Sequence, residues 1–365
     1  MRDPAMRRAL VIINEFGSIG IDHDLVVPAQ EETVIEMASG CLCCTIRGDL
    51  VRALRDAPWR FARNGERWFD RVLIETTGLA DPIPILHTLL TNKRIAELYR
   101  LDSVVTTVDA ATGMATLNAQ LEAVRQIAVA DRLVLTKTDL VPAEDAQRLQ
   151  ARLRTINPAA PIAVAIQGQL DPAGLFGAAL YDADAKGDDV RSWLNAEAYE
   201  AQKGHDDDHR HHHAHNGDDH DHDVNRHDDH IRSICLTFDE PLDGDAFEGW
   251  LEVLTMFVGP QILRIKGILN LAEFDRPVVV HGVQHIFHPP LMLDGWPSDD
   301  RRSRMVFITR DLDEAALRQT LGLLMNDISR FEVYGPRDTG LTGAVPQLLL
   351  RHSGNLDLAS AIPRM

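Results

Sequence analysis

The first 165 residues alternate between short apolar runs and longer stretches with helical spacing. A short apolar run that ends in a polar or acidic residue is typical of a strand buried on both faces of a parallel sheet. Such runs occur at residues 9–14, 71–75, 103–109, 132–136 and 161–165. The segments between them have the spacing of helices, over residues 46–57, 83–98, 118–129 and 143–155. This alternation predicts an α/β doubly wound domain, in which ligands bind at the carboxyl ends of the strands.

The order of elements changes after residue 230. The pattern predicts strands at residues 230–239, 262–271, 278–283 and 304–310, with helices at 243–257 and 313–325. The order β-α-β-β-β-α predicts a smaller α+β domain with a mostly antiparallel sheet, over residues 231–330. Residues 331–365 form a tail with no firm pattern.

Residues 166–230 are predicted to connect the two domains. Residues 166–203 are weakly patterned and favour one or two helical pieces. Residues 204–230 contain ten His and nine Asp and one large apolar residue, Val224, so this tract is predicted to be disordered. Imidazole is a good ligand for Zn, Ni, Co and Cu, which favours a metal-collecting role over that of a plain solvated linker.

The charge excludes some classes of partner. The formal net charge is −18, and such a surface repels phosphate backbones, so we expect no nucleic-acid partner. No apolar run approaches the ~18 residues that a membrane span needs. The N-terminus has no signal-peptide pattern. We therefore expect a cytoplasmic protein with no membrane association, and the oligomeric state stays open, a homodimer included.

Three of the four cysteines fall within four residues, as Cys41, Cys43 and Cys44, and Cys235 lies far away. In a reducing compartment, clustered thiols favour a metal site or a redox group over a disulfide framework. Thiolates bind Zn²⁺, Cu(I) or Fe–S clusters in preference to hard ions. One tight loop can supply only some of the four ligands of a tetrahedral metal site. Such an incomplete site suits a metal ion that is transferred to another protein.

The segment Thr136-Lys137-Thr138-Asp139 directly follows a predicted strand. Guanine presents its N1–H and its exocyclic amine as adjacent donors, and the Asp139 carboxylate can accept from both. The Lys137 stem can cover the face of the base. A solvated loop between a strand and a helix explains the same four residues. Only their position, directly after a predicted strand, favours guanine binding over such a loop.

Two further groups of residues are candidates for chemistry. Glu75 ends a buried strand, where a carboxylate is well placed to hold Mg²⁺ near phosphates, and Gly78 would let the backbone approach a γ-phosphate. The alternative is a strand end with a turn glycine. His281, His285 and His288 lie close together in the second domain, where histidines are more often structural than metal-binding.

Taken in this order, these motifs resemble the CobW-like GTPases, a P-loop family of metallochaperones. The resemblance covers about residues 9–165 and 231–325. The matching segments are Asn14-Glu15-Phe16-Gly17 with Gly20-Ile21-Asp22, GCLCCTIRGDL at 40–50, RVLIETTGLADP at 71–82, Asp109, TKTD at 136–139, ILRIKGIL at 262–269, GVQHIF at 282–287 and SRMVFI at 303–308.

The resemblance implies a P-loop-type GTPase domain over residues 1–165 that couples GTP hydrolysis to delivery of a metal, usually zinc, to a client protein. It implies GTP, Mg²⁺ and Zn²⁺ as ligands. The implied roles are guanine binding by Thr136, Lys137 and Asp139, action at Mg²⁺ by Glu75, sensing of the γ-phosphate by Gly78, and metal binding by Cys41, Cys43 and Cys44, with Glu15 as a further ligand. Asp22, water or the client are alternatives to Glu15.

The chain departs from the family at one point, because it contains no GxxxxGK[ST] sequence. That loop cradles the β-phosphate and supplies a Lys and an Mg²⁺-binding hydroxyl. In the family, the loop and the strand before it precede the segment that matches residues 1–16, and that strand lies inside the sheet. We therefore expect an N-terminally incomplete domain, lacking its first strand, with the true start codon upstream. The chain as written should bind GTP poorly.

Three alternatives to a zinc chaperone remain. The same mechanism could deliver cobalt for cobalamin synthesis, or iron or cobalt to a nitrile hydratase. A metal-buffering protein would use the cysteines and the His tract without hydrolysing GTP. A thiol redox protein is disfavoured, because adjacent Cys43 and Cys44 form a strained disulfide poorly.

Overall fold

The computed structural model describes residues 6, 8–14, 34–37, 45–76, 78, 80–177, 194 and 230–325. Contacts divide the chain into two compact units, which are residues 1–147 with 161–179, and residues 148–160 with 180–365. The α/β class predicted for the first half and the antiparallel sheet predicted for the second are both confirmed. Among the described residues, no helix is both long and apolar enough to cross a lipid bilayer.

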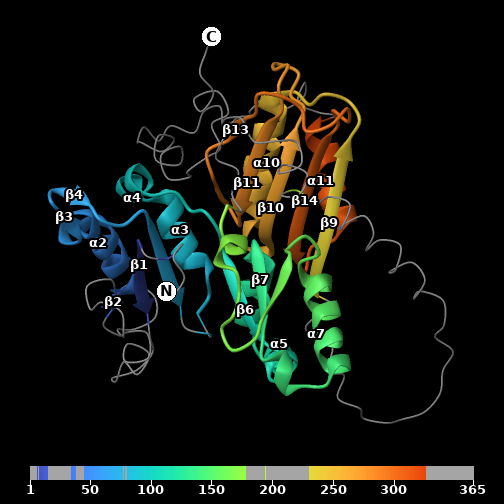
Figure 1. Cartoon of the computed structure of the whole chain (residues 1–365). Coiled ribbons are helices and arrows are strands. Elements are labelled where there is room, and N and C mark those ends of the chain that lie inside the picture. Colours follow the sequence, from blue (N-terminus) through green and yellow to red (C-terminus); the bar gives the residue numbers. More distant parts are fainter. Residues whose placement is uncertain are drawn as a thin grey trace, which may run out of the picture. The chain divides into compact units, whose positions relative to one another are not determined.

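The first unit contains two three-stranded parallel sheets (Figure 1). One has the order β2-β1-β5 and the other the order β6-β7-β8. The strands are β1 (Ala9–Asn14), β2 (Val34–Met37), β5 (Arg71–Thr76), β6 (Val105–Asp109), β7 (Arg132–Thr136) and β8 (Ile162–Ala165). Five of these match predicted strands, and β2 was not predicted.

Helix α2 (Thr45–Arg60) packs against the first of these sheets. Leu50 and Leu54 of α2 are buried together with Leu10 and Ile12 of β1. Tyr99 closes this core, because its ring stacks on Phe69 with centroids 6.4 Å apart and its hydroxyl donates to the Leu54 carbonyl at 2.8 Å. Burial raises the pKa of Tyr99 to about 12.

Two of the predicted helices differ from the observed ones. The segment 83–98 forms α3 (Ile83–Thr91) and α4 (Lys93–Leu98), because the Asn92 side chain caps α4 by accepting from the Ile95 amide. The segment 118–129 forms α6 (Leu121–Val129), and an extended residue, Gln120, separates it from α5 (Gly113–Ala119), most of which was not predicted. Helix α7 (Ala143–Ile156) agrees with its prediction.

The second unit has a sheet with the strand order β12-β11-β10-β14-β9, and β13 also pairs with β11. All of its pairings are antiparallel. The elements are β9 (Ile231–Phe238), α10 (Gly244–Val258), β10 (Ile262–Leu269), β11 (Val278–Val283), β12 (Ile286–Phe287), β13 (Leu291–Met292), β14 (Ser303–Arg310) and α11 (Glu314–Met325). The short strands β12 and β13 were not predicted.

The core of the second unit lies between its sheet and the helices α10 and α11. Trp250 of α10 is almost fully buried and meets the Phe307 ring of β14 edge-on, with centroids 6.3 Å apart. Its indole N–H donates to the Thr320 hydroxyl of α11 at 3.1 Å, so one side chain ties the two helices to the sheet. Every residue of β10 is buried, as expected for a central strand.

The connector is described in part. Its first residues form a short 3₁₀ helix, η3 (Pro172–Leu175), with Asp171 as its cap. Residues 178–193 and 195–229 lie outside the described residues, and so do residues 326–365. The predicted disorder of the His/Asp tract and the predicted tail therefore stay predictions.

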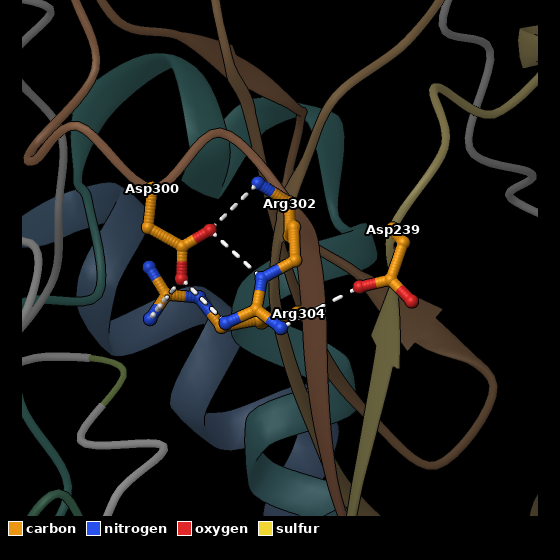
Figure 2. Close-up of polar contacts among 4 residues, drawn as sticks. All are labelled: Asp239, Asp300, Arg302 and Arg304. Carbon is orange, nitrogen blue, oxygen red and sulfur yellow. Dashed lines mark hydrogen bonds and ion pairs between the residues drawn. The ribbon is translucent and has the colours of Figure 1, made fainter.

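Figure 2 shows a charged cluster that joins the ends of β9 and β14. Asp300 accepts from the Arg302 amide at 3.1 Å, from its Nε at 3.0 Å and from its Nη2 at 3.0 Å. Arg302 also reaches Asp239 at 3.5 Å, and Arg304 lies 3.7 Å from Asp300. The hydrogen bonds from Arg302, followed by the charge of Arg304, lower the pKa of Asp300 to about 2.

We predict that Asp300→Asn destabilises the protein at neutral pH by up to about 1 kcal/mol, the range of partly exposed ion pairs. The folded-state pKa of Asp300 is depressed, so its contribution is complete above its ordinary pKa of 3.8 and is lost as the pH falls toward about 2. Urea denaturation of both proteins between neutral pH and pH ~3 should therefore show the difference shrinking. The control is Asp299→Asn, which removes the same charge from an exposed neighbour. An equal loss in the control would contradict the role of the cluster.

Candidate functional site

The pairing of β6 with β7 builds the first part of the site. The two strands are parallel, and their last paired residues are Asp109 and Thr136. The Ala110 amide donates to the Thr136 carbonyl at 2.9 Å, and the Thr136 hydroxyl donates to the Val108 carbonyl at 3.3 Å. The residues that follow both strands therefore emerge side by side at the carboxyl edge of the sheet.

Lys137 makes the turn at this edge. It has a left-handed backbone with φ of 57°, and its carbonyl accepts from the Leu140 amide at 3.1 Å. Its Nζ lies 2.5 Å from Oδ2 of Asp109. The hydrogen bond from Lys137 and that from the Ala111 amide, at 2.8 Å, lower the pKa of Asp109. Asp109 is therefore an anion that holds the lysine at the end of its strand.

Asp139 lies in the 3₁₀ helix η2 (Thr138–Leu140) that follows the turn. Its side chain is exposed, and the neighbouring Leu140 is 67% exposed. The Asp139 carboxylate is therefore open to solvent two residues after Lys137. The structure thus brings Thr136, Lys137 and Asp139 into one turn.

Glu75 and Gly78 lie at the end of β5. Glu75 is exposed, and it pairs in register with Ile13 of β1. A Cβ added to Gly78 would meet no atom within 4 Å, so there is open space beside the backbone here. This open space would let the backbone at Gly78 come close to a ligand. Nothing in the described part of the structure requires a glycine at this position.

Helix α6 holds the loop that contains Gly78. The Gln126 amide donates to the carbonyls of Gly78, at 3.1 Å, and Ala80, at 2.8 Å. Arg125 binds Asp81 at 2.7 Å. The Gln126 carbonyl accepts from the Thr106 hydroxyl of β6 at 2.8 Å, so α6 links the loop after β5 to the start of β6. Sequence reasoning missed these residues, although Arg125 and Gln126 lie side by side between apolar residues of the helix.

The predicted metal ligands Glu15, Cys41, Cys43 and Cys44 lie outside the described residues, as does the alternative ligand Asp22. Within the described part of the chain, no group of three or more His, Cys, Asp or Glu side chains could hold a metal ion, so the three histidines of the second domain form no such site.

Two of those histidines have a structural arrangement. The rings of His281 and His288 stack with centroids 4.6 Å apart and planes 11° apart. Burial, followed by the charges of His288, Arg264 and Lys266, lowers the pKa of His281 well below its ordinary value, which keeps its ring neutral.

Comparison with known families gives two matches. Residues 1–164 match the CobW/HypB/UreG nucleotide-binding domain, and residues 231–324 match the cobalamin synthesis protein cobW C-terminal domain. Each match ends close to a boundary of the described elements, at β8 and at α11.

Two bacterial relatives share most of their length with this chain. The zinc chaperone YjiA of Escherichia coli is 30% identical over 309 residues, which cover 84% of this chain and 87% of the relative. The zinc chaperone CobW of Pseudomonas aeruginosa is 32% identical, and the match covers 86% of this chain and 83% of the relative. A solved structure of Zn(II)-bound YjiA GTPase from E. coli has a TM-score of 0.59 at 22% identity, over 87% of this chain and 98% of that one, which shows the shared fold.

We predict that Gln126→Met loosens the loop after β5. The change removes both amide hydrogen bonds, each worth about 0.5–1.5 kcal/mol, while keeping a similar side-chain length. Amide hydrogen exchange over residues 78–83 should become about tenfold faster or more. The control is Gln147→Met on the exposed surface of α7. Unchanged exchange at residues 78–83 would mean that Gln126 does not hold the loop.

Proposed function

The chain belongs to the CobW/HypB/UreG family, and we propose that it is a cytoplasmic, GTP-dependent metallochaperone that binds zinc at its Cys41–Cys44 loop and transfers the ion to a client protein. The observation that carries this proposal is the turn at the end of β7, where Lys137 and Asp139 stand at the carboxyl edge of a parallel sheet. The relatives' zinc-chaperone names support zinc as the cargo.

Asp139 accepts the two adjacent N–H groups of guanine in this proposal. The exposed position of its carboxylate supports direct contact with a base. The aliphatic stem of Lys137 lies along the base, because the αL turn starts it at the strand edge and Asp109 fixes its charged end. Adenine offers no such donor pair, so this turn selects guanine.

Glu75 and Gly78 act on the phosphate side. Mg²⁺ prefers oxygen ligands and keeps several waters, and the exposed Glu75 carboxylate fits that chemistry at the end of β5. When bound, the ion would neutralise phosphate charge. The open space beside Gly78 admits a γ-phosphate, and the bonds from Gln126 would carry its presence or absence to α6. Residues 1–365 contain no GxxxxGK[ST] sequence, the loop that cradles the β-phosphate in P-loop proteins.

The zinc site in this proposal consists of the thiolates of Cys41, Cys43 and Cys44, with Glu15 as the fourth ligand. Glu15 directly follows β1, so a shift of that strand end would move it relative to the thiolates. Nucleotide hydrolysis then lowers zinc affinity and releases the ion. A 100-fold change in affinity corresponds to about 2.7 kcal/mol of coupling, an ordinary allosteric magnitude.

We predict that Asp139→Asn reverses the preference between GTP and xanthosine triphosphate. The asparagine amide offers one acceptor and one donor, and xanthine carries a carbonyl where guanine carries the amine. Loss of one charged hydrogen bond costs about 1.5–3 kcal/mol, so GTP should bind more than tenfold more weakly. The two affinities are measured by competition with a fluorescent nucleotide. Their ratio does not depend on how tightly the protein holds the phosphates, because both nucleotides are triphosphates.

The matched control for Asp139 is Asp145→Asn on the first turn of α7, which removes the same charge near the same edge. An unchanged ratio of affinities in Asp139→Asn would show that Asp139 does not read the base.

We predict that Cys43→Ser abolishes tight zinc binding, because two thiolates and one other ligand leave the tetrahedral site incomplete. Zinc binding to the unaltered chain should release protons, since thiols must ionise to become ligands. Both effects are measured with a chromophoric chelator and by calorimetry in buffers of different ionisation enthalpy. The control is Cys235→Ala, which removes the buried thiol of β9 outside the cluster. Tight zinc binding that survives replacement of all three clustered cysteines would refute the proposed site.

Coupling between the two ligands is a separate prediction. Zinc affinity should be higher with a non-hydrolysable GTP analogue than with GDP. In the Asp139→Asn variant, the corresponding difference in zinc affinity should appear only when xanthosine nucleotides replace the guanosine nucleotides. Equal zinc affinity in the two nucleotide states would leave the cysteines with a static, structural zinc.

A further inference from the structure

The chain reverses its direction directly after β8. Gln167 and Gly168 have φ of 51° and 74°, and the Gln169 amide donates to the Ile166 carbonyl at 2.9 Å, which closes the turn. The segment that follows contains η3 and ends at Phe176 and Gly177. We call residues 171–177 the strap, because its last two residues contact elements of both sheets of the first unit.

The strap holds two elements that are far from it in the sequence. The Gly177 amide donates to both carboxylate oxygens of Asp102, at 3.2 and 3.0 Å, and Asp102 lies just ahead of β6. The guanidinium of Arg71, the first residue of β5, lies 4.3 Å from the centroid of the Phe176 ring. Two consecutive residues therefore join the start of β5, in one sheet, to the entry of β6, in the other.

This junction matters because no strand ladder spans it. Within the described residues, β5 pairs with β1 and β6 pairs with β7, and no backbone pairing joins β5 to β6. The spacing of the two strands at their starts is therefore set by side-chain and loop contacts such as those of the strap. The same two strands carry Glu75 and Asp109 near their carboxyl ends. A change of spacing at the starts thus bears on the distance between these two carboxylates.

The contacts of the strap can open without unfolding the sheets. The Arg71 side chain is 37% exposed, Gly177 is exposed and Phe176 is half-buried. Segments with few buried apolar contacts and exposed hydrogen bonds open at a lower free energy than core strands. The strap is also where the described part of the connector ends, so a displacement of the connector acts first on Gly177.

The backbone of Gly177 makes the closed state depend on glycine. Its φ is 69°, in the left-handed region, and a Cβ added there would meet no atom within 4 Å. An alanine at this position would therefore clash with nothing and would be disfavoured only by its backbone conformation.

We infer that the strap is a conformational device of the first unit. When closed, it holds the starts of β5 and β6 at one spacing. When it opens, the two sheets separate more freely, and the connector that leads to the second unit is the part of the chain that can open it. The inference goes beyond the proposed function and does not depend on nucleotide or zinc binding.

The test measures the distance between the two sheets in the full chain. Spin labels are attached through a keto-bearing unnatural amino acid at the exposed positions of Trp59, on α2, and Val164, on β8, so that the native cysteines stay unlabelled. Pulsed electron paramagnetic resonance should give one narrow distance distribution for the otherwise unaltered chain. The double variant Phe176→Ala, Gly177→Ala should give a broader distribution that extends to longer distances.

Amide hydrogen exchange of Gly177→Ala alone measures the opening of the strap. Exchange over residues 171–177 should become at least about tenfold faster, which corresponds to about 1.4 kcal/mol. Circular dichroism confirms that the variants are folded.

The matched control is Gly174→Ala with Phe257→Ala. It makes the same two kinds of substitution at a glycine that has no left-handed backbone and at a phenylalanine that is 76% exposed on α10. A distance distribution that is unchanged in the strap variant would overturn the inference, even if exchange over the strap becomes faster. Equal broadening in the control would overturn it as well.

Discussion

The parallel pairing of β6 with β7 is the constraint on which the candidate nucleotide site depends. In a parallel ladder, neighbouring strands end at the same edge, and here the register sets Asp109 opposite Thr136. The carboxylate therefore meets the lysine that follows β7, and the 2.5 Å contact between Asp109 and Lys137 holds the turn that presents Asp139. A slip of one residue in either strand would send the side chains of that strand to the other face of the sheet. The geometry of the proposed base-binding turn thus depends on strand register and not on the loop alone.

A second constraint links the two halves of the first unit. Within the described residues, β5 pairs with β1 and β6 pairs with β7, but β5 and β6 do not pair with each other. The link between the halves runs instead through side chains, since Gln126 binds the backbone after β5 while its own carbonyl binds Thr106 of β6. Side-chain hydrogen bonds of this kind are few and individually weak, so the loop after β5 is easier to displace than the strands. That is a suitable property for a loop proposed to respond to a phosphate.

The sequence pattern predicted the helices and strands whose own residues carry the apolar signal. The run at 132–136 is buried over its central residues and shows a continuous apolar signal. The strand at 262–269 is buried throughout, although Arg264 and Lys266 interrupt its apolar residues. The breaks at Asn92 and Gln120 were missed, because helical spacing continues through both positions. The hairpin of β3 (Ala62–Arg63) and β4 (Glu66–Arg67) was also missed, although Asn64-Gly65 is a strong turn signal, because its two-residue strands are charged and exposed.

The site was predicted only where its residues are close in sequence. Thr136 to Asp139 form one turn, so the motif contained its own geometry. The bonds from Gln126 to Gly78 and Ala80 join residues 48 and 46 positions apart, and no local pattern reveals them.

In the proposed site, the Lys137–Asp109 pair would affect how readily a base binds. Lys137 is 56% exposed in this pair, and such exposed ion pairs contribute no more than about 1 kcal/mol. A hydrogen bond to a charged carboxylate contributes about 1.5–3 kcal/mol, and Asp139 can accept two from guanine. Adjustment of Lys137 over an incoming base therefore costs less than one of these hydrogen bonds gains. The pair therefore orders the Lys137 side chain without preventing a base from binding. One salt bridge can thus preorganise the turn and still let Lys137 adjust to a ligand.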